Sequence, residues 1–246
     1  MKAMILAAGL GTRLKPLTDT KPKALIDVGG YTMLELSIRY LKKYGIKNII
    51  INIHHFPDQI IQYIQSKNYF KINIEFSDES SELLETGGAI KHASSYLNAK
   101  EPFILMNGDI LTDLDLKEMI QFHLLHKPLV TLGVKDRETS RSLIFNQQMR
   151  LVGWKNNQTG ERKGKNIEAT NIALGFSCIQ IINPAIFDLI IENGAFSIID
   201  LYLRLMDSYQ IIGFRQDQSK WLEFGRIERL QQTIDSEEFK FLLKTL

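Results

Sequence analysis

Residues 2–14, KAMILAAGLGTRL, join a short apolar run to a turn made of small residues. The apolar run, Lys2–Leu6, has the length and composition of a strand that is buried on both faces. Four of residues 7–11, AAGLG, are alanine or glycine, so backbone amides can approach a phosphate that larger side chains would block. The stretch therefore predicts a phosphate-binding loop after a buried first strand, although a plain tight turn would have the same spelling.

Two other phosphate-binding loops do not fit this stretch. A dinucleotide-binding fingerprint requires a third glycine three residues after Gly11, where Leu14 stands. It also requires an acidic residue after the second strand, and none lies near Ile53. A Walker-type loop requires Gly-Lys followed by Ser or Thr, and this triplet does not follow the first strand.

Strand-like and helix-like segments alternate up to about residue 134. Strands are predicted at Lys2–Leu6, Asn48–Ile53, Ile72–Phe76, Phe103–Met106 and Val130–Val134. Helices are predicted between them, at Met33–Tyr44, Asp58–Ser66, Gly87–Leu97 and Asp115–Lys127. This alternation predicts the α/β class, with a mostly parallel twisted sheet flanked by helices and with ligand-binding loops at the carboxyl ends of the strands.

The alternation ends after residue 134. Ser142–Phe145 and Leu151–Trp154 predict a hairpin, the polar segment Lys155–Lys165 predicts an exposed loop, and Asn171–Ile182 predicts a strand. The remaining segments predict helices at Pro184–Asn193 and Ser197–Asp207, a strand at Ile211–Arg215 and a closing helix from Ile227.

Composition places the chain among ordinary globular proteins. Hydrophobic residues make up 44% of its 246 residues and charged residues 24%. The net charge of +2 provides no broad positive field for nucleic acid. A single cysteine, Cys178, excludes an internal disulfide. With neither a signal peptide nor a membrane-spanning stretch in the sequence, we expect a cytoplasmic protein without nucleic-acid or membrane partners.

Charged residues follow the turn and two later elements. Arg13 and Lys23 bracket a segment in which prolines restrict the backbone, so they can present fixed positive charges to a triphosphate. Residues 84–89, LETGGA, open a predicted helix. Their small residues would let the edge of a ligand approach the start of the helix, or they could serve only as a helix cap. Residues 103–109, FILMNGD, end a buried strand in Asp109, a candidate Mg²⁺ ligand because magnesium prefers carboxylates together with phosphate oxygens.

These motifs resemble the signature of the sugar-phosphate nucleotidyltransferases. The matching motifs are LAAGxGTRLxPLT over residues 6–18 and PKxL over residues 22–25. The resemblance implies a Rossmann-like nucleotidyltransferase fold with a small sugar-binding lobe. It implies one domain over residues 1–246, in which about 1–134 bind the nucleotide and about 135–246 bind the sugar and include the closing helix. It also implies nucleotidyl transfer from a nucleoside triphosphate to a sugar 1-phosphate, with release of pyrophosphate and with Mg²⁺ as cofactor.

The resemblance further implies roles for individual residues. Arg13 would steady the outgoing pyrophosphate and Lys23 would contact the reacting phosphates, so these two and Asp109 form the predicted catalytic set. Nucleotide contacts are implied for Leu6, Ala7, Ala8, Gly9, Gly11, Thr12, Arg13, Lys23, Glu85, Thr86, Gly87 and Gly88. The last four, with the preceding Asp78–Leu83, are implied to lie beside the base and ribose.

The turn that supplies the family's second metal ligand has a different sequence in this chain. Its usual form is Trp-x-Asp-x-Gly, and residues 221–225 read WLEFG, with Glu223 in place of the aspartate. Glutamate keeps the charge but is one methylene longer, so we expect Asp109 and Glu223 to share the metal after a slight shift of the backbone or the metal. Arg226 follows where a small hydroxyl residue is frequent.

The residues that would contact the sugar are less clearly indicated by the sequence. Asn107 and Glu168 are the candidate sugar contacts, but many relatives have lysine after the glutamate, where this chain has Ala169. Lys163 or Lys165 could supply that cation.

As a whole the chain is most similar to family members that transfer a uridylyl group to N-acetylmuramate 1-phosphate. Guanylyl transfer to mannose 1-phosphate and thymidylyl or uridylyl transfer to glucose 1-phosphate stay open. Because Glu223 and Arg226 depart from the usual spelling, a catalytically inactive protein that binds a nucleotide-sugar is a further alternative.

Overall fold

The fold is built on a central sheet whose amino-terminal strands are parallel. The computed structural model describes residues 1–165 and 167–246, and its described residues form a ten-stranded sheet. Four neighbouring strands run in the order β6, β1, β4, β5, and all three pairings are parallel. Their bounds are Ala3–Leu6 for β1, Asn48–Ile53 for β4, Asn73–Asp78 for β5 and Phe103–Asn107 for β6.

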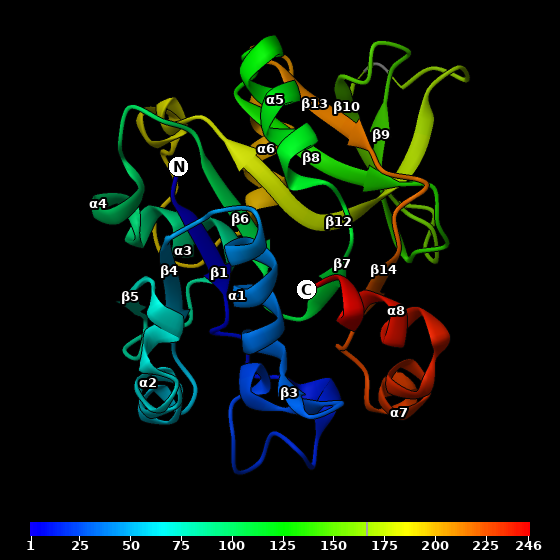
Figure 1. The fold of residues 1–246 in the computed structure, drawn as a ribbon. Helices are drawn as coiled ribbons and strands as arrows, with labels where there is room; N and C mark the ends of the chain where they lie inside the picture. Colours follow the sequence, from blue (N-terminus) through cyan, green and yellow to red (C-terminus); the bar gives the residue numbers. More distant parts are fainter. Residues whose placement is uncertain (166) are drawn as a thin grey trace.

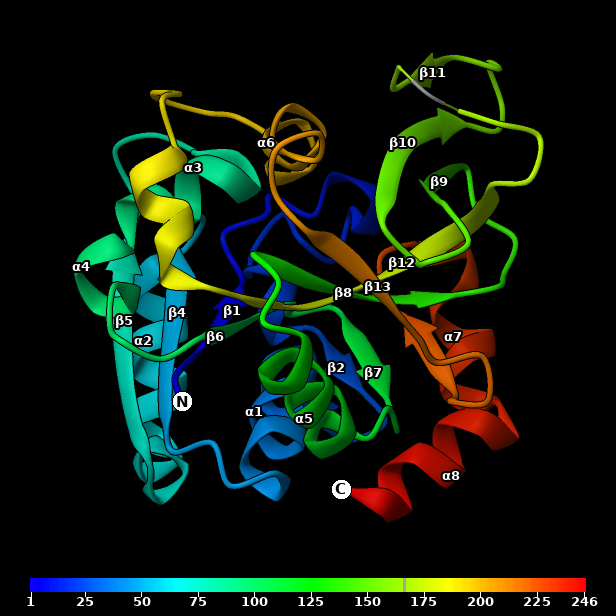
Figure 2. The same cartoon turned by 90° about the horizontal axis from the view of Figure 1, so that it is seen from above.

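Helices cover both faces of this sheet (Figure 1, Figure 2). One face packs against α1 (Met33–Lys43), α2 (Pro57–Ser66) and α5 (Leu116–His126), and the other against α3 (Glu85–His92), α4 (Ser94–Leu97) and α6 (Ile198–Leu205). Along β1, Met4 joins one core cluster and Ile5 joins the other. Because helices cover both faces of the sheet, side chains on both faces of β1 are buried, which accounts for its continuous apolar sequence. Helices on both faces of a sheet with parallel strands confirm the predicted α/β class.

The second half of the chain adds antiparallel strands. Strand β12 (Ile172–Ile182) pairs antiparallel with β6, β8 (Val130–Lys135) and β9 (Arg141–Phe145). The predicted hairpin is confirmed as β9 and β10 (Leu151–Asn156), and β13 (Ile211–Arg215) pairs parallel with β8. Among the described residues, none of the helices combines the length and apolar character that crossing a bilayer requires.

Several predicted elements are wrong in detail. The polar segment predicted as a loop contains a short strand, β11 (Arg162–Lys163), which pairs with β10. The helix expected at Pro184–Asn193 is a 3-10 helix, η4, that ends at Leu189. The closing helix is two helices, α7 (Ile227–Asp235) and α8 (Glu237–Thr245). Ser236 separates them because its backbone is extended and its side chain caps α8.

Very short strands escaped the sequence analysis altogether. They are β2 (Asp27–Val28), β3 (Tyr31–Thr32), β7 (Ile110–Thr112) and β14 (Trp221–Glu223). A third core cluster joins this region, because Leu14, Leu111 and Phe224 pack with Phe239 of α8. The carboxyl-terminal helices are thereby attached to the segment that follows β1.

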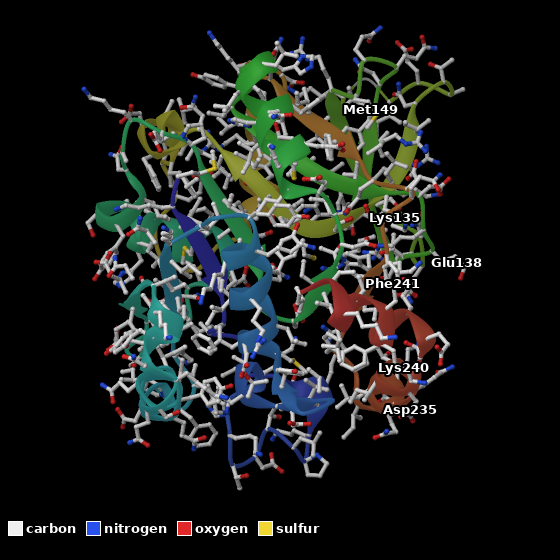
Figure 3. The ribbon with its side chains drawn as sticks, in the orientation of Figure 1. Lys135, Glu138, Met149, Asp235, Lys240 and Phe241 are labelled. Atoms are coloured by element: carbon white, nitrogen blue, oxygen red, sulfur yellow. The ribbon has the colours of Figure 1, made fainter. Side chains whose placement is uncertain are left out.

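Lys135 fixes the chain segment that leads into β14. Its ammonium group donates hydrogen bonds to the carbonyl oxygens of Asp217, at 2.6 Å, and Ser219, at 2.5 Å. Figure 3 shows Lys135 at the side of the molecule where Lys240 and Phe241 mark α8.

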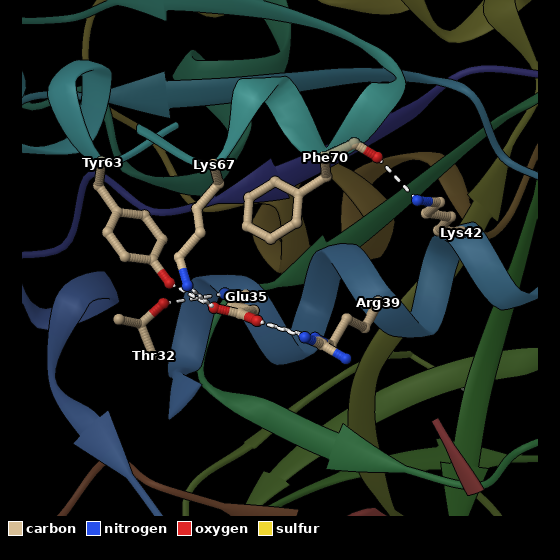
Figure 4. Close-up of polar contacts among 7 residues, drawn as sticks. All are labelled: Thr32, Glu35, Arg39, Lys42, Tyr63, Lys67 and Phe70. Carbon is tan, nitrogen blue, oxygen red and sulfur yellow. Dashed lines mark hydrogen bonds and ion pairs between the residues drawn. The ribbon is translucent and has the colours of Figure 1, made fainter. Parts of the chain in front are cut away.

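A buried carboxylate joins α1 to α2 (Figure 4). The Glu35 side chain is 3% exposed and pairs with Arg39 at 2.7 Å and Lys67 at 3.2 Å, while the Tyr63 hydroxyl donates to it. Burial alone raises the pKa of Glu35, but hydrogen bonds from Tyr63, Arg39 and Lys67 outweigh burial and leave the pKa below its usual value.

Replacing Glu35 by Gln should lower the free energy of unfolding at pH 7 by about 1–3 kcal/mol, because Arg39 and Lys67 lose their shared counterion. Since the folded state lowers this pKa, the stabilisation is present above the unfolded-state pKa and is lost as the pH falls through the folded-state pKa. Urea unfolding at pH 7 and pH 3 measures the difference, with exposed Glu138→Gln as the control. An equal loss at both pH values would contradict the prediction.

Candidate active site

The small-residue turn follows β1 and has a fixed backbone. Gly11 has a φ of 67°, and a Cβ added there would lie 2.7 Å from Thr18 and 2.9 Å from the Cβ of Lys23. Only glycine avoids both the strained backbone and the clash. Beside Gly9, by contrast, an added Cβ would meet no atom within 4 Å, so a ligand can approach the backbone there.

The register of the parallel strands aligns three strand ends with this turn. Leu6 lies between Asn52 of β4 and Asn107 of β6. The Asn52 side-chain oxygen accepts a hydrogen bond from the Ala7 amide at 2.7 Å. The amide of Gly108 donates to the Leu6 carbonyl oxygen at 3.0 Å. The turn is therefore hydrogen-bonded to both neighbouring strand ends.

Lys23 and Asp109 form an ion pair beside the turn. Lys23 begins a short 3-10 helix, η2 (Lys23–Leu25), and Asp109 follows β6. The Lys23 ammonium group donates to the Asp109 carboxylate, and the two side chains are 17% and 14% exposed. The predicted catalytic lysine and aspartate are thus in direct contact.

Strand β14 brings Glu223 next to Asp109. It pairs antiparallel with β7, which places Glu223 opposite Ile110. The Phe224 amide donates to the Asp109 carbonyl oxygen at 2.9 Å. Because β7 begins one residue after Asp109, this pairing fixes the two acidic residues side by side.

Both acidic side chains face the same small space at Gly225. A Cβ added to Gly225 would lie 2.8 Å from a Glu223 carboxylate oxygen, 3.5 Å from an Asp109 carboxylate oxygen and 3.3 Å from the Arg13 guanidinium. Arg13 also lies 3.8 Å from Glu223, with both side chains substantially exposed. The amino-terminal turn and the carboxyl-terminal turn therefore meet here.

The donor set of this space fits magnesium. Within residues 1–165 and 167–246, no group of three or more His, Cys, Asp or Glu is gathered closely enough to hold a metal. Magnesium is commonly bound through one or two carboxylates, with substrate phosphates and water as the other ligands. Asp109 and Glu223 suit that arrangement and stay the predicted ligands. Arg226 precedes α7 as its N-cap residue and makes no side-chain capping bond, so it does not cap the helix as a small hydroxyl residue could.

A cavity of about 380 Å³ lies beside the turn. Nine of the predicted site residues line it: Leu6, Ala7, Ala8, Gly9, Lys23, Glu85, Thr86, Asn107 and Asp109. Gly11, Thr12, Arg13 and Glu223 lie outside its lining, at the turn and in the adjacent space at Gly225.

Gly87 and Gly88 also lie outside the cavity lining, and packing explains why they are glycines. A Cβ on Gly87 would lie 2.3 Å from the Phe196 ring, and one on Gly88 would lie 2.4 Å from the Gly194 carbonyl oxygen. The Gly87 amide donates to the Phe196 carbonyl oxygen at 2.8 Å, so this donor is already used. The pair holds the segment before α6 against α3.

Glu168 lies away from the cavity. It is exposed, and its carboxylate accepts a hydrogen bond from the Thr170 hydroxyl at 3.3 Å. The two lysines considered as sugar-side cations pair elsewhere, Lys163 with Asp200 at 3.0 Å and Lys165 with Asp207 at 4.0 Å. The structure brings none of these residues to the cavity lining.

The sequence analysis missed two polar residues that line the cavity, Asn52 and Ser197, whereas Glu79 lies in the segment Asp78–Leu83, which the family resemblance places beside the base and ribose. Asn52 could have been identified from the sequence, because a polar asparagine is unusual among the isoleucines of a predicted buried strand. Ser197 carried no such signal, since hydroxyl residues are ordinary at helix starts.

Cys178 lies close enough to Asp109 and Glu223 for their charges to act on it. Burial, together with these two negative charges, raises the pKa of its thiol to about 12, so the thiol does not supply a thiolate nucleophile at neutral pH. Beside it, Trp221 donates to the Ser177 carbonyl oxygen at 2.9 Å. These contacts support the turn that carries Glu223.

The family model for nucleotidyl transferases matches residues 2–143. N-acetylmuramate alpha-1-phosphate uridylyltransferase of Neisseria meningitidis is 33% identical over 94% of this chain and 96% of its own length. Mannose-1-phosphate guanyltransferase of Aspergillus oryzae is 37% identical, over 51% of this chain and 35% of its own length.

A solved structure shows the same fold. HddC from Yersinia pseudotuberculosis, complexed with GMP-PN, has a TM-score of 0.74 and 25% identity, and the match covers 95% of this chain and 98% of HddC. The fold, the matched family model and the near full-length relative agree with the motifs around the turn. The chain therefore belongs to the nucleotidyl transferase family and is a sugar-1-phosphate nucleotidyltransferase.

Proposed function

We propose that this enzyme transfers a uridylyl group from UTP to N-acetylmuramate 1-phosphate and releases pyrophosphate. The similarity to the Neisseria uridylyltransferase supports this choice, because it extends over nearly the whole of both chains. The guanyltransferase of Aspergillus is similar over 128 residues, about half of this chain, and that of Kluyveromyces lactis over 92% of this chain but only 62% of its own length, at 29% identity. Guanylyl transfer to mannose 1-phosphate is the second candidate, supported by that match and by HddC in complex with GMP-PN.

The proposed reaction is an in-line displacement at phosphorus. A phosphate oxygen of the sugar 1-phosphate forms a bond to the α-phosphorus, and the bond from that phosphorus to the bridging oxygen of pyrophosphate breaks. The acceptor is already an anion, so no side-chain nucleophile is required. Catalysis then depends on holding two anions together and neutralising their charge.

The chain's own groups suit that task. The open backbone at Gly9 can hold the triphosphate, while Lys23 lines the cavity and can neutralise the reacting phosphates. Arg13 lies outside the cavity beside the space between the carboxylates, where it can steady the leaving pyrophosphate. Asp109 and Glu223 would hold Mg²⁺, which supplies further charge neutralisation at the phosphates when bound. Asn107 lines the cavity, which supports its role as a sugar contact. Glu168 does not line the cavity, so the cavity gives no support for the same role at Glu168.

Removing either partner of the central ion pair should abolish most of the activity. We expect Asp109→Asn to lower kcat/KM by about 100-fold or more with little change in the free energy of unfolding, because the variant keeps the size of the side chain. Lys23→Ala should weaken the use of both substrates. Pyrophosphate release measures turnover, and Lys21→Ala is the matched control because Lys21 is exposed on the same segment. Unchanged rates in both variants would refute the assignment.

Glu223 should set the metal requirement. In Glu223→Gln the Mg²⁺ concentration that gives half-maximal rate should rise about tenfold or more, because one of two anionic ligands is lost. The measurement is a magnesium titration of pyrophosphate release at saturating substrates. Glu228→Gln, an exposed change on α7, is the control and should match the wild type. An unaltered requirement in Glu223→Gln would show that Glu223 is not a ligand.

The substrate is tested by a panel of UTP, GTP, dTTP and CTP against N-acetylmuramate, mannose and glucose 1-phosphates. We expect the highest kcat/KM for UTP with N-acetylmuramate 1-phosphate. A higher value for GTP with mannose 1-phosphate would favour the second candidate. Binding of a nucleotide-sugar without turnover of any pair would instead identify an inactive binding protein.

A further inference from the structure

Arg137 is a half-buried cation that the proposed reaction does not use. It follows β8, and the Cζ atom of its guanidinium lies 4.0 Å from the centroid of the Trp221 ring. One terminal nitrogen, Nη2, donates to the Phe176 carbonyl oxygen at 2.9 Å. The Nε atom is buried and meets no acceptor within the part of the chain that the structure describes. The ring face of Trp221 is therefore the group that stabilises this part of the cation.

A role in stability alone explains this arrangement poorly. Burial lowers the pKa of Arg137, while the nearby charge of Glu223 acts against the decrease. Burying a charge with an unpaired donor costs free energy, and apolar residues of similar size often replace such groups without loss of stability. A function at the adjacent site is a physical reason to keep the buried cation.

The Trp221 side chain is held by two contacts. Its indole nitrogen donates to the Ser177 carbonyl oxygen at 2.9 Å, and Arg137 covers a face of its ring. Gly175 determines where Arg137 lies, since a Cβ added to this glycine would be 2.9 Å from the Cγ atom of Arg137 and 3.2 Å from its Cζ atom. The missing side chain at Gly175 thus leaves the room that Arg137 occupies beside Trp221.

Trp221 and Glu223 share one face of β14. Side chains two residues apart along a strand point the same way, so a contact that holds the ring also sets the direction of the carboxylate. Strand β14 has three residues and forms a two-stranded sheet with β7. Such a short pair of strands is only weakly held by its own hydrogen bonds. The orientation of Glu223 therefore depends on what packs against Trp221.

We propose that Arg137 is a positioning residue for the metal: by stacking on Trp221 it holds the face of β14 that presents Glu223 to Mg²⁺. This inference rests on the proposed function, because it takes Glu223 to be a metal ligand. Arg137 acts through Trp221 and touches neither the metal nor a substrate. Replacing a residue that orients a metal ligand typically lowers metal affinity by about 10- to 100-fold.

The requirement for magnesium measures this role. In Arg137→Leu the Mg²⁺ concentration that gives half-maximal pyrophosphate release should rise about tenfold, while kcat at saturating Mg²⁺ changes by less than about twofold. Arg137→Lys keeps the charge but loses the planar group that stacks on the ring, so we expect an intermediate rise of about threefold. Gly175→Ala keeps the arginine but displaces it and should resemble Arg137→Leu. Arg141→Leu, the same change at an exposed arginine of β9, is the control and should match the wild type.

Calorimetry of UTP binding supplies a readout that does not depend on turnover. We expect Arg137→Leu to weaken UTP binding about fivefold or more in Mg²⁺ and to leave it unchanged in EDTA, because UTP then binds without the metal. Glu223→Gln should do the same. In the double variant the two losses should not add, since Arg137 acts through Glu223. A merely structural role would weaken binding in both conditions and would add to the loss from Glu223→Gln.

The outcomes separate this inference from the proposed function. Equal UTP affinities of the wild type and Arg137→Leu in Mg²⁺, or additive losses in the double variant, would overturn the inference while the proposed function stands. If Glu223→Gln has no effect, Arg137 has no ligand to position and both assignments fail. Turnover of GTP with mannose 1-phosphate alone would end the proposed substrate, and the same test then runs with GTP. If Arg137→Leu does not fold, Gly175→Ala and Arg137→Lys carry the comparison.

Discussion

The parallel register of β6, β1 and β4 is the constraint on which the site depends. It places Leu6 between Asn52 and Asn107, so three strand ends reach one edge of the sheet together. Hydrogen bonds from Ala7 and Gly108 then attach the small-residue turn to both neighbours. A shift of one residue would turn each side chain to the opposite face of the sheet, so the observed register also fixes where the polar groups at the strand ends point.

The site is completed by the last part of the chain, which returns to the first. The pairing of β14 with β7 sets Glu223 beside Asp109, and Lys135 holds the segment that leads into β14. The third core cluster packs α8 against residues that follow β1. Packing far from the cavity therefore helps to decide whether the two carboxylates face one space.

Much of the fold and part of the site could be predicted from the sequence. Periodicity located the parallel strands and their helices, because burial on both faces leaves long apolar runs. It missed β7 and β14, since strands of three residues are too short to show a period. The motif predicted that the turn, Asp109 and Glu223 would meet, but it could not show that Gly87 and Gly88 are required by Phe196 and Gly194, because that contact joins distant segments.

The buried polar residues give the cavity a direction. A triphosphate that entered in reverse would place its phosphates against Glu79 and its base against the Lys23–Asp109 pair, and both contacts would be unfavourable. Asn52 contributes to the phosphate end and the base end alike, through Ala7 and through Glu79. One uncharged side chain at the end of β4 thus ties the small-residue turn to the buried carboxylate of Glu79, and that link follows from the sheet register.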